Sequence, residues 1–381
     1  MFIMTSSPAL PWLLPRSSDE SGGVHRAAVY LGLYLVALGT GGIKPCATAL
    51  GADQFDGADP AERVAKGSFF NWYYFSINIG SLLSATLLVW VQDNIGWTVG
   101  YAIPTVLIGF GLAVRLRWED LQAQATGGGR QFRFFDKAAI VLASSEKKGP
   151  WRLCTVSQVE ELKMLLRMSP VWAVMLVFFA VTAQMSTTLI ELGMTMDNRV
   201  GGFVVPPASL STFDLVSVLI WVPLYDAVLV PLARRVTGEH RGFTQLQRIG
   251  VGLALSAAAM AYAASVETRR LASASSMSIM WLAPCYFVLG AAEVFTSIGM
   301  LEFFYDQSPV SMKSLGTALA HLAVAGGSYL NSALLGAVAS ATGWISDNLD
   351  QGHLDNFFWF MAALSTLNLL QFVYCSIRYK S

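Results

Sequence analysis

Long apolar stretches separated by shorter polar loops dominate the pattern of hydrophobic and polar positions along the chain. A helix that spans a bilayer needs about 20 mainly apolar residues. Several of the stretches contain Gly or Pro, which membrane helices tolerate when neighbouring groups satisfy the freed backbone. The pattern predicts an all-α membrane protein with about nine spans: Val24–Leu50, Phe70–Val91, Trp97–Val114, Pro170–Ile190, Leu210–Leu232, Ile249–Val266, Met277–Tyr305, Ser314–Ala341 and Phe357–Ile377.

A polar segment separates the third predicted span from the fourth. Within it, Arg133–Leu142 and Ser157–Met168 show helical periodicity with charge on one face, which indicates a surface helix. The predicted organisation is a partial N-terminal bundle of three spans at 1–115, a cytoplasmic linker with this surface helix at 116–168, and a six-helix bundle at 169–381. Carriers are commonly built from two related halves, and three plus six spans resemble a six-plus-six carrier without its first three helices.

The composition agrees with a surface that faces lipid. Hydrophobic residues make up 54% of the 381 residues and charged residues 13%, which is about half of the charge typical of soluble domains. The formal net charge is zero, so there is no overall basic surface for nucleic acid. The four cysteines lie far apart and the four histidines lack metal-ligand spacing, so neither a disulfide framework nor a metal site is predicted. No GxSxG, HExxH or phosphate-binding glycine motif is present, and we predict no enzyme.

The distribution of Lys and Arg among the loops predicts the orientation. Basic residues concentrate in 115–167, after the fifth span and in the C-terminal tail, whereas 92–96 and 342–356 contain none. Because cytoplasmic loops carry the excess of positive charge, we expect the C-terminus to be cytoplasmic and the segment before Val24 to lie outside. Arg199, with Arg269 and Arg270, departs from this pattern.

Ionisable residues inside membrane spans are costly and usually functional, and three of them stand out in the predicted spans. Lys44 follows a glycine cluster late in the first span, and Glu293 lies in the middle of the seventh. Lys44 could bind a substrate carboxylate or take part in coupling, or it could extend to the interface. Glu293 could carry a proton or pair with a substrate ammonium, since a carboxyl group shielded from water readily holds a proton. Asp214 could have such a role or could simply cap its helix.

Two amide side chains inside predicted spans each allow two interpretations. Asn78 lies in the middle of the second span and Gln184 near the end of the fourth. An amide donates and accepts hydrogen bonds at once. Each could therefore hold part of a substrate or could join neighbouring helices.

An acid and a basic pair flank the end of the fifth span. Asp226 precedes Arg234 and Arg235 on the predicted cytoplasmic side. These residues could form a conformational latch, and hence a gate, or the arginines could be ordinary positive anchors of the loop.

Several runs of sequence resemble the proton-dependent oligopeptide transporter family, in its plant nitrate/peptide branch. The resemblance extends from about Val24 to Tyr379. The run Phe70–Leu82 is similar to the family signature, and Ala183–Thr187 and Arg241–Arg248 are closest to the di- and tripeptide transporters of that branch. Further similar runs are Leu38–Cys46, Gly51–Asp56, Glu293–Phe295 and Leu301–Pro309.

The resemblance implies the major facilitator fold and alternating access driven by a proton gradient, with no cofactor besides the coupling proton. It implies that Lys44 takes part in proton coupling and contacts the peptide carboxylate, that Asn78 lies in the binding site, and that Glu293 meets the peptide amino group. The family's nitrate carriers have a histidine where this sequence has Thr182. Peptide transport is therefore the leading expectation, and low-affinity nitrate transport is the alternative. The family also implies a plasma-membrane or vacuolar location.

The proton-coupling ExxER or ExxEK motif of the family's first helix is absent from this sequence. We expect a chain that lacks about the first three transmembrane helices, with impaired coupling or no transport on its own. A second alternative is therefore a truncated, non-transporting membrane protein that associates with a full-length carrier.

Overall fold

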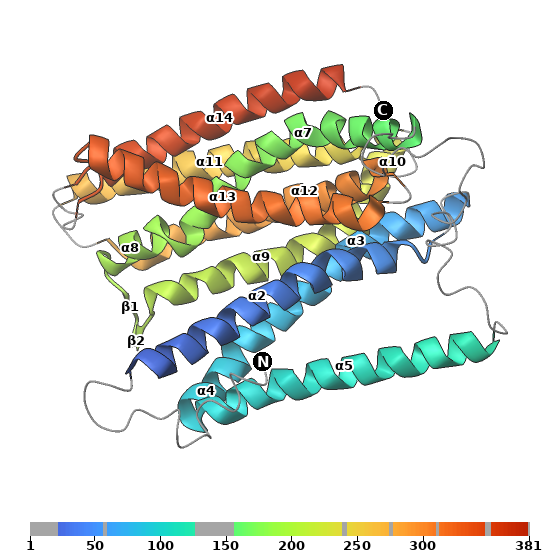
Figure 1. The fold of residues 1–381 in the computed structure, drawn as a ribbon. Helices are drawn as coiled ribbons and strands as arrows, with labels where there is room; N and C mark the ends of the chain where they lie inside the picture. Colours follow the sequence, from blue (N-terminus) through green and yellow to red (C-terminus); the bar gives the residue numbers. More distant parts are fainter. Residues whose placement is uncertain are drawn as a thin grey trace, which may run out of the picture. The chain divides into compact units, whose positions relative to one another are not determined.

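The structure, a computed structural model, describes residues 22–55, 59–125, 156–237, 242–273, 277–309, 312–346 and 352–379. In these ranges the chain is almost entirely helical, with one small antiparallel hairpin formed by β1 (Arg199–Val200) and β2 (Phe203–Val204) (Figure 1). Eight of the described helices are long and apolar enough to cross a membrane. The predicted all-helical membrane architecture is confirmed.

The helices follow one another along the chain with few extended connections. In the described residues the α-helices are α2 (Gly22–Ala52), α3 (Pro60–Leu83), α4 (Val89–Asn94), α5 (Trp97–Ala125), α7 (Val156–Thr182), α8 (Thr188–Met194), α9 (Ser211–Leu224), α10 (Val230–Thr237), α11 (Gln245–Ala272), α12 (Ala283–Gln307), α13 (Lys313–Ala341) and α14 (Leu354–Arg378). Shorter turns extend or join them: the 3₁₀ turns η3 (Ala183–Ser186), η4 (Pro207–Leu210) and η6 (Ile279–Leu282), and the π-helical turns η2 (Ser84–Leu88) and η5 (Tyr225–Leu229).

Two segments differ from the sequence-based expectation. The predicted span Trp97–Val114 lies in α5, but its apolar part, Thr98–Gly111, is shorter than a full span. Ser157–Met168 is helical as expected, yet it forms the first turns of the membrane-length helix α7, which continues through Pro170. Proline removes one backbone donor without ending a membrane helix when neighbouring groups compensate. The other predicted linker helix, Arg133–Leu142, lies outside the described residues.

The chain divides into two compact units. Unit 1 comprises Met1–Gly41 and Leu83–Glu160, and unit 2 comprises Gly42–Leu82 and Glu161–Ser381. In the described part of unit 1, α4 packs against α5, where Gly100 faces the Gln92 side chain. The residues of the candidate site described below belong to unit 2.

Close helix contacts fix α12 within unit 2. It packs against α9, α11 and α13, and α11 also packs against α14. A Cβ atom at Gly252 of α11 would lie 2.7 Å from the carbonyl oxygen of Ala292, and one at Gly290 of α12 would lie 2.8 Å from that of Asp214 on α9. Only glycine allows such approach of two backbones, as in other tightly packed membrane helices.

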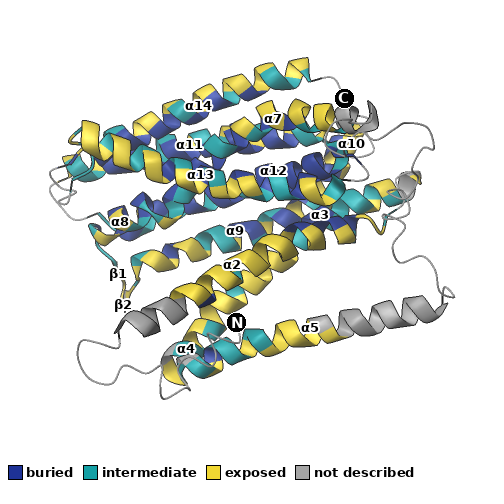
Figure 2. Ribbon diagram, viewed as in Figure 1, coloured by how far each residue is buried: buried dark blue, intermediate teal, exposed yellow. Residues whose placement is uncertain are grey.

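Burial follows this arrangement. The helix α12 is buried along most of its length, whereas α13 and α14 carry many exposed positions (Figure 2). The exposed positions include large apolar side chains such as Tyr329 and Ile377, each 79% exposed. Such faces suit contact with lipid, so the core of unit 2 lies around α12.

Candidate functional site

The acid Glu293 lies half-buried in the middle of α12 and is contacted from α3. The hydroxyl of Tyr74 donates a hydrogen bond to Glu293 Oε1. Asp214 reaches the same region from α9, because Gly290 lets its backbone and carboxylate lie directly against α12. The charges of Asp214 and Glu293 act on each other. The result is a phenol and two carboxyl groups gathered from three helices.

Asp214 does not cap α9, although helix capping was one of the two interpretations of this residue. The N-cap position is Leu210, and no side chain caps this end. Within the described residues, Asp214 Oδ1 is buried without a hydrogen-bond partner. A buried carboxylate oxygen without a partner is costly, which is typical of a functional position.

Asn78 lies one helical turn beyond Tyr74 on α3. It is buried, and its Nδ2 donates to the carbonyl oxygen of Tyr74 at 2.9 Å. Its amide oxygen has no bond in the described structure and remains available as an acceptor. Lys44, on α2, is exposed and forms no ion pair with Glu293 in the described part of the chain. The structure thus places Asn78 beside the Tyr74–Glu293 pair but does not join Lys44 to it.

Gln184 is used by neighbouring helices. It is fully buried in η3, where its Nε2 donates to Asn331 Oδ1 of α13 at 2.6 Å and to the carbonyl oxygen of Ala180 at 3.2 Å. Its Oε1 accepts from the hydroxyl of Thr188 at 2.6 Å. Because both donors and the acceptor are engaged, this geometry favours the reading in which Gln184 joins helices.

Asp226 lies at the centre of a polar group that we call the Asp226 cluster: Ser68, Asn71, Trp72, Asp226 and Arg248. Its carboxylate accepts from Ser68 Oγ at 2.8 Å, Asn71 Nδ2 at 2.9 Å and Trp72 Nε1 at 3.2 Å. The amide oxygen of Asn71, Oδ1, accepts a hydrogen bond from Arg248 Nη2 at 2.8 Å. The buried Arg248 guanidinium also lies 4.0 Å from the centre of the Tyr225 ring.

The predicted latch partners of Asp226 are placed differently. Arg234 and Arg235 are exposed on α10, and the hydrogen-bond donors to Asp226 described above come from α3 instead. Arg234 lines a cavity of about 240 Å³ together with Asp226, Arg248 and Glu302. The hydrogen bonds of Asp226 therefore connect η5 with α3, which is far from it in the sequence.

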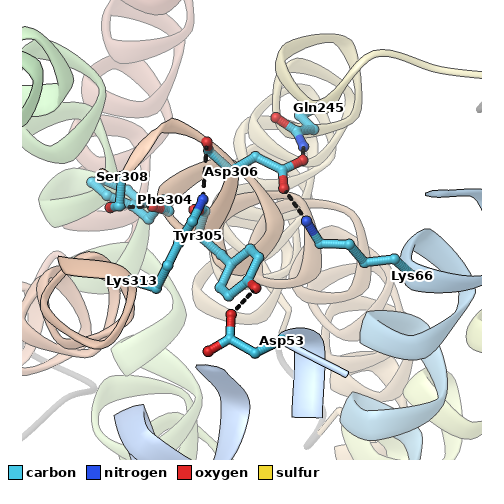
Figure 3. A network of polar contacts seen from close by, with 8 residues as sticks. All are labelled: Asp53, Lys66, Gln245, Phe304, Tyr305, Asp306, Ser308 and Lys313. Atoms are coloured by element: carbon cyan, nitrogen blue, oxygen red, sulfur yellow. Dashed lines mark hydrogen bonds and ion pairs between the residues drawn. The ribbon is translucent and has the colours of Figure 1, made fainter. Parts of the chain in front are cut away.

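A second polar group, the Asp306 cluster, lies near the C-terminal end of α12 (Figure 3). Asp306 Oδ1 pairs with Lys66 Nζ at 2.6 Å, and Oδ2 accepts from Gln245 Nε2 at 2.7 Å. Tyr305 donates its hydroxyl proton to Asp53, and Lys313 Nζ donates to the Tyr305 carbonyl at 2.6 Å. The cluster comprises Asp53, Lys66, Gln245, Tyr305, Asp306 and Lys313. It joins the end of α2 and the start of α3 to α11, α12 and α13.

Sequence reasoning missed several of these residues. Tyr74, Arg248 and Asp306 all lie within runs that resemble the family, but nothing in the runs indicates which residues meet. The sequence pattern did not single out Lys66, and only its contact with Asp306 indicates a specific role. A paired acid and base in separate runs would be a weak signal without spatial information.

Comparisons with known proteins agree with this architecture. The sequence pattern of the POT family matches residues 1–116 and 124–349. The Arabidopsis thaliana Protein NRT1/PTR FAMILY 8.3 is 45% identical over an alignment of 453 positions, which covers 100% of this chain and 77% of the relative. Protein NRT1/PTR FAMILY 8.1 of the same plant is 41% identical, covering 100% and 79%.

Two solved structures show the same fold. An auto-inhibited POT family peptide transporter has a TM-score of 0.64 at 22% identity, covering 100% of this chain and 81% of that one. A mutant of the peptide transporter POT, in complex with alafosfalin, has a TM-score of 0.59 at 16% identity, covering 98% and 77%. At these identities the likeness concerns the fold.

Proposed function

Because the chain belongs to the POT family, as its motifs indicated, we propose that it carries di- and tripeptides together with protons across a membrane by alternating access. Membership makes it a multi-pass helical transporter with a major facilitator type of fold. The observation that carries the finer proposal is the half-buried Glu293, held by Tyr74 and accompanied by Asp214. Ionisable groups inside a membrane span are costly and mark substrate or ion pathways.

Charge complementarity supports a peptide as the substrate. A dipeptide carries an ammonium at one end and a carboxylate at the other. Glu293 suits the ammonium, and Lys44 on α2 suits the carboxylate. The free acceptor of Asn78, beside Tyr74, suits a peptide N–H. Polar groups of this kind orient a ligand and give specificity.

The acid pair supports proton coupling. Two carboxyl groups that act on each other in an apolar setting are most stable when they share one proton. When a substrate ammonium binds at Glu293, it favours the charged carboxylate there, so the shared proton is favoured at Asp214. The Tyr74 hydroxyl can continue to donate its hydrogen bond to Glu293. We therefore assign proton carriage to Glu293 with Asp214, and a supporting role to Lys44.

The two polar clusters support a gate. Both join α3 to the helices that follow residue 169, near the start of α3 and the end of α12. The distribution of Lys and Arg supports a cytoplasmic location for this end. We infer that the clusters hold it closed and that inward opening breaks the Lys66–Asp306 and Asn71–Asp226 links. In this assignment Arg234 and Arg235 border the gate and Asp226 closes it. The membrane itself would be the plasma or the vacuolar membrane.

Nitrate is the second candidate substrate. Lys44 is exposed and unpaired in the described part of the chain, so it could balance a small anion. The relatives carry both transporter names, NRT1 and PTR. A nitrate carrier would leave Glu293 without a ligand group to bind.

Recording from voltage-clamped oocytes tests the proposal. The chain is expressed, its arrival at the surface is confirmed, and currents are measured at acidic external pH with a dipeptide and with nitrate. A dipeptide-evoked inward current supports the proposal, and a response to nitrate alone supports the second candidate. Silence from a folded surface protein contradicts both. The alternative of a partner that does not transport then predicts co-purification with a full-length relative.

A further inference from the structure

The cavity beside the Asp226 cluster has charged walls that the proposed gate does not account for. Its volume is about 240 Å³, and residues of α3, η5, α10, α11 and α12 line it, all within unit 2. Pockets for drug-sized ligands have volumes of about 300–1,000 Å³, so this cavity suits a smaller molecule.

Arg248 brings a buried positive charge to the cavity wall. The residue is only 4% exposed, and its Nη2 bonds to two neutral acceptors, Asn71 Oδ1 at 2.8 Å and the carbonyl oxygen of Val294 at 3.4 Å. Its Nε is buried without a hydrogen-bond partner among the described residues. Because Asn71 also donates to Asp226, this amide separates Arg248 from the nearby carboxylate. A buried guanidinium normally contacts a counter-charge, so Arg248 indicates a site for an anionic group.

Arg234 adds a second guanidinium to the same cavity from α10. It is exposed and forms no ion pair in the part of the chain that the structure describes. The planar fork of an arginine matches the two oxygens of a carboxylate. Arg234 and Arg248 can therefore hold one carboxylate from two helices.

Asp226 supplies the opposite charge to this cavity. Its three hydrogen-bond donors, from Ser68, Asn71 and Trp72, are all neutral, so its negative charge is not balanced by direct contact with a cation. A carboxylate has about four acceptor sites, and one remains for an ammonium. A purely anionic ligand would bring its charge close to Asp226, whereas a zwitterion complements both signs.

Part of the cavity wall is apolar. Val64, Val230 and Phe243 line it together with the charged groups, and the Phe243 ring stacks on that of Tyr225 with their centres 6.5 Å apart. Binding sites commonly combine such apolar surface with a few polar groups that orient the ligand. A small zwitterion with an apolar side chain therefore matches the size, charge and surface of this cavity.

We propose that the cavity binds a free α-amino acid with an apolar side chain, whose carboxylate pairs with Arg234 and Arg248 and whose ammonium pairs with Asp226. The bound amino acid connects α10 and α11 with the link from Asp226 to α3, so it stabilises the closed form of the proposed gate. Peptide hydrolysis releases such amino acids, so the class of reaction that consumes the carried peptides supplies this ligand. The regulatory consequence rests on the transport function proposed above, whereas binding itself does not, and the test therefore measures binding.

The test uses the full chain, purified in detergent micelles, and isothermal titration calorimetry with L-leucine. The comparison probes are L-leucinamide, which lacks the carboxylate, 4-methylpentanoate, which lacks the ammonium, and inorganic phosphate. We expect each of the three to bind about tenfold or more weakly than leucine, because each loses a charge-assisted contact. Phosphate or 4-methylpentanoate binding as tightly as leucine would identify a site for anions alone and overturn the proposal.

Variants locate the bound amino acid. Arg234→Gln should lower the affinity for leucine about tenfold, and Asp226→Asn should reduce the preference for leucine over 4-methylpentanoate. Arg235→Gln is the matched control, because Arg235 is the next exposed residue of α10 and does not line the cavity in the described structure. Glu293→Gln should leave the affinity for leucine unchanged, since Glu293 belongs to the proposed transport site.

Three results would overturn the site: equal affinities in Arg234→Gln and Arg235→Gln, a loss in Glu293→Gln as large as that in Arg234→Gln, or no leucine binding by a folded wild type. Leucine binding by a protein that gives no dipeptide current in oocytes would refute the transport function and leave this site standing. Dipeptide currents without leucine binding would refute this site alone.

Discussion

Asn71 is the single side chain that connects an acid and a base in the Asp226 cluster. Its Nδ2 donates to Asp226 and its Oδ1 accepts from Arg248. An amide can perform both tasks because it has a donor end and an acceptor end. Asn71→Ala removes both bonds at once without introducing a charge.

The loss of stability caused by Asn71→Ala depends on which hydrogen bonds Asp226 and Arg248 retain. Asp226 retains its hydrogen bonds from Ser68 and Trp72. The free energy lost on its side therefore lies at the low end of the range for one hydrogen bond to a charged group. Arg248 retains a longer 3.4 Å bond to the carbonyl oxygen of Val294, and its Nε is buried without a partner in the described structure, so its loss lies at the high end. Together we expect the free energy of unfolding to fall by about 4 kcal/mol.

Unfolding of the purified protein in mixed micelles, followed by tryptophan fluorescence, measures this difference. Asn94→Ala is the matched control, because Asn94 is exposed and bonds only to a carbonyl oxygen of its own helix among the contacts described. The control should stay within about 0.5 kcal/mol of the wild type. An Asn71→Ala protein as stable as the control would refute the assignment of Asn71 as the bridge.

Three further substitutions test other parts of the structure. Glu293→Gln should lower dipeptide currents by about tenfold or more, since it removes a charged partner of the ammonium, and should change nitrate currents by less than about twofold; equal losses would contradict the assignment. Lys66→Met should lower the free energy of unfolding by about 2 kcal/mol, because Asp306 is only 19% exposed, whereas the exposed Lys163→Met should have little effect. Gln184→Leu should lower stability by about 2 kcal/mol without changing the KM for a dipeptide. A KM that rises with unchanged stability would restore Gln184 to the binding site.

Hydropathy predicts the spans of this protein because lipid imposes length and composition directly. It predicts α14 to within a few residues but begins the α12 span earlier than the helix. The predicted span for α11 is too short at both ends, and at the C-terminal end this is because the last turns carry Glu267 and Arg270. These two side chains pair with each other at 2.6 Å, which lets a helix continue through polar positions. The apolar pattern contains no information about such pairs.

The site was predictable only in part. Glu293 stands out because a carboxyl group without polar neighbours in an apolar helix is unusual, but Tyr74 does not, because a tyrosine in an aromatic run suggests packing. For Asp226 the sequence offers the nearby arginines as partners, whereas the structure joins it to α3. Partners separated by more than a hundred residues depend on tertiary packing, which no local pattern records.

The glycines at 252 and 290 have a consequence for how the carrier can diversify. They bring the main chain of α12 directly onto α11 and α9, so Glu293 takes its position from backbone contacts rather than from interchangeable side chains. Larger residues at these two positions would disturb folding before they altered substrate choice. The glycines just before Lys44 on α2 differ, because a Cβ atom added at Gly41 or Gly42 would have nothing within 4 Å. Substitutions around Lys44 can therefore change substrate selectivity while the position of Glu293 stays the same.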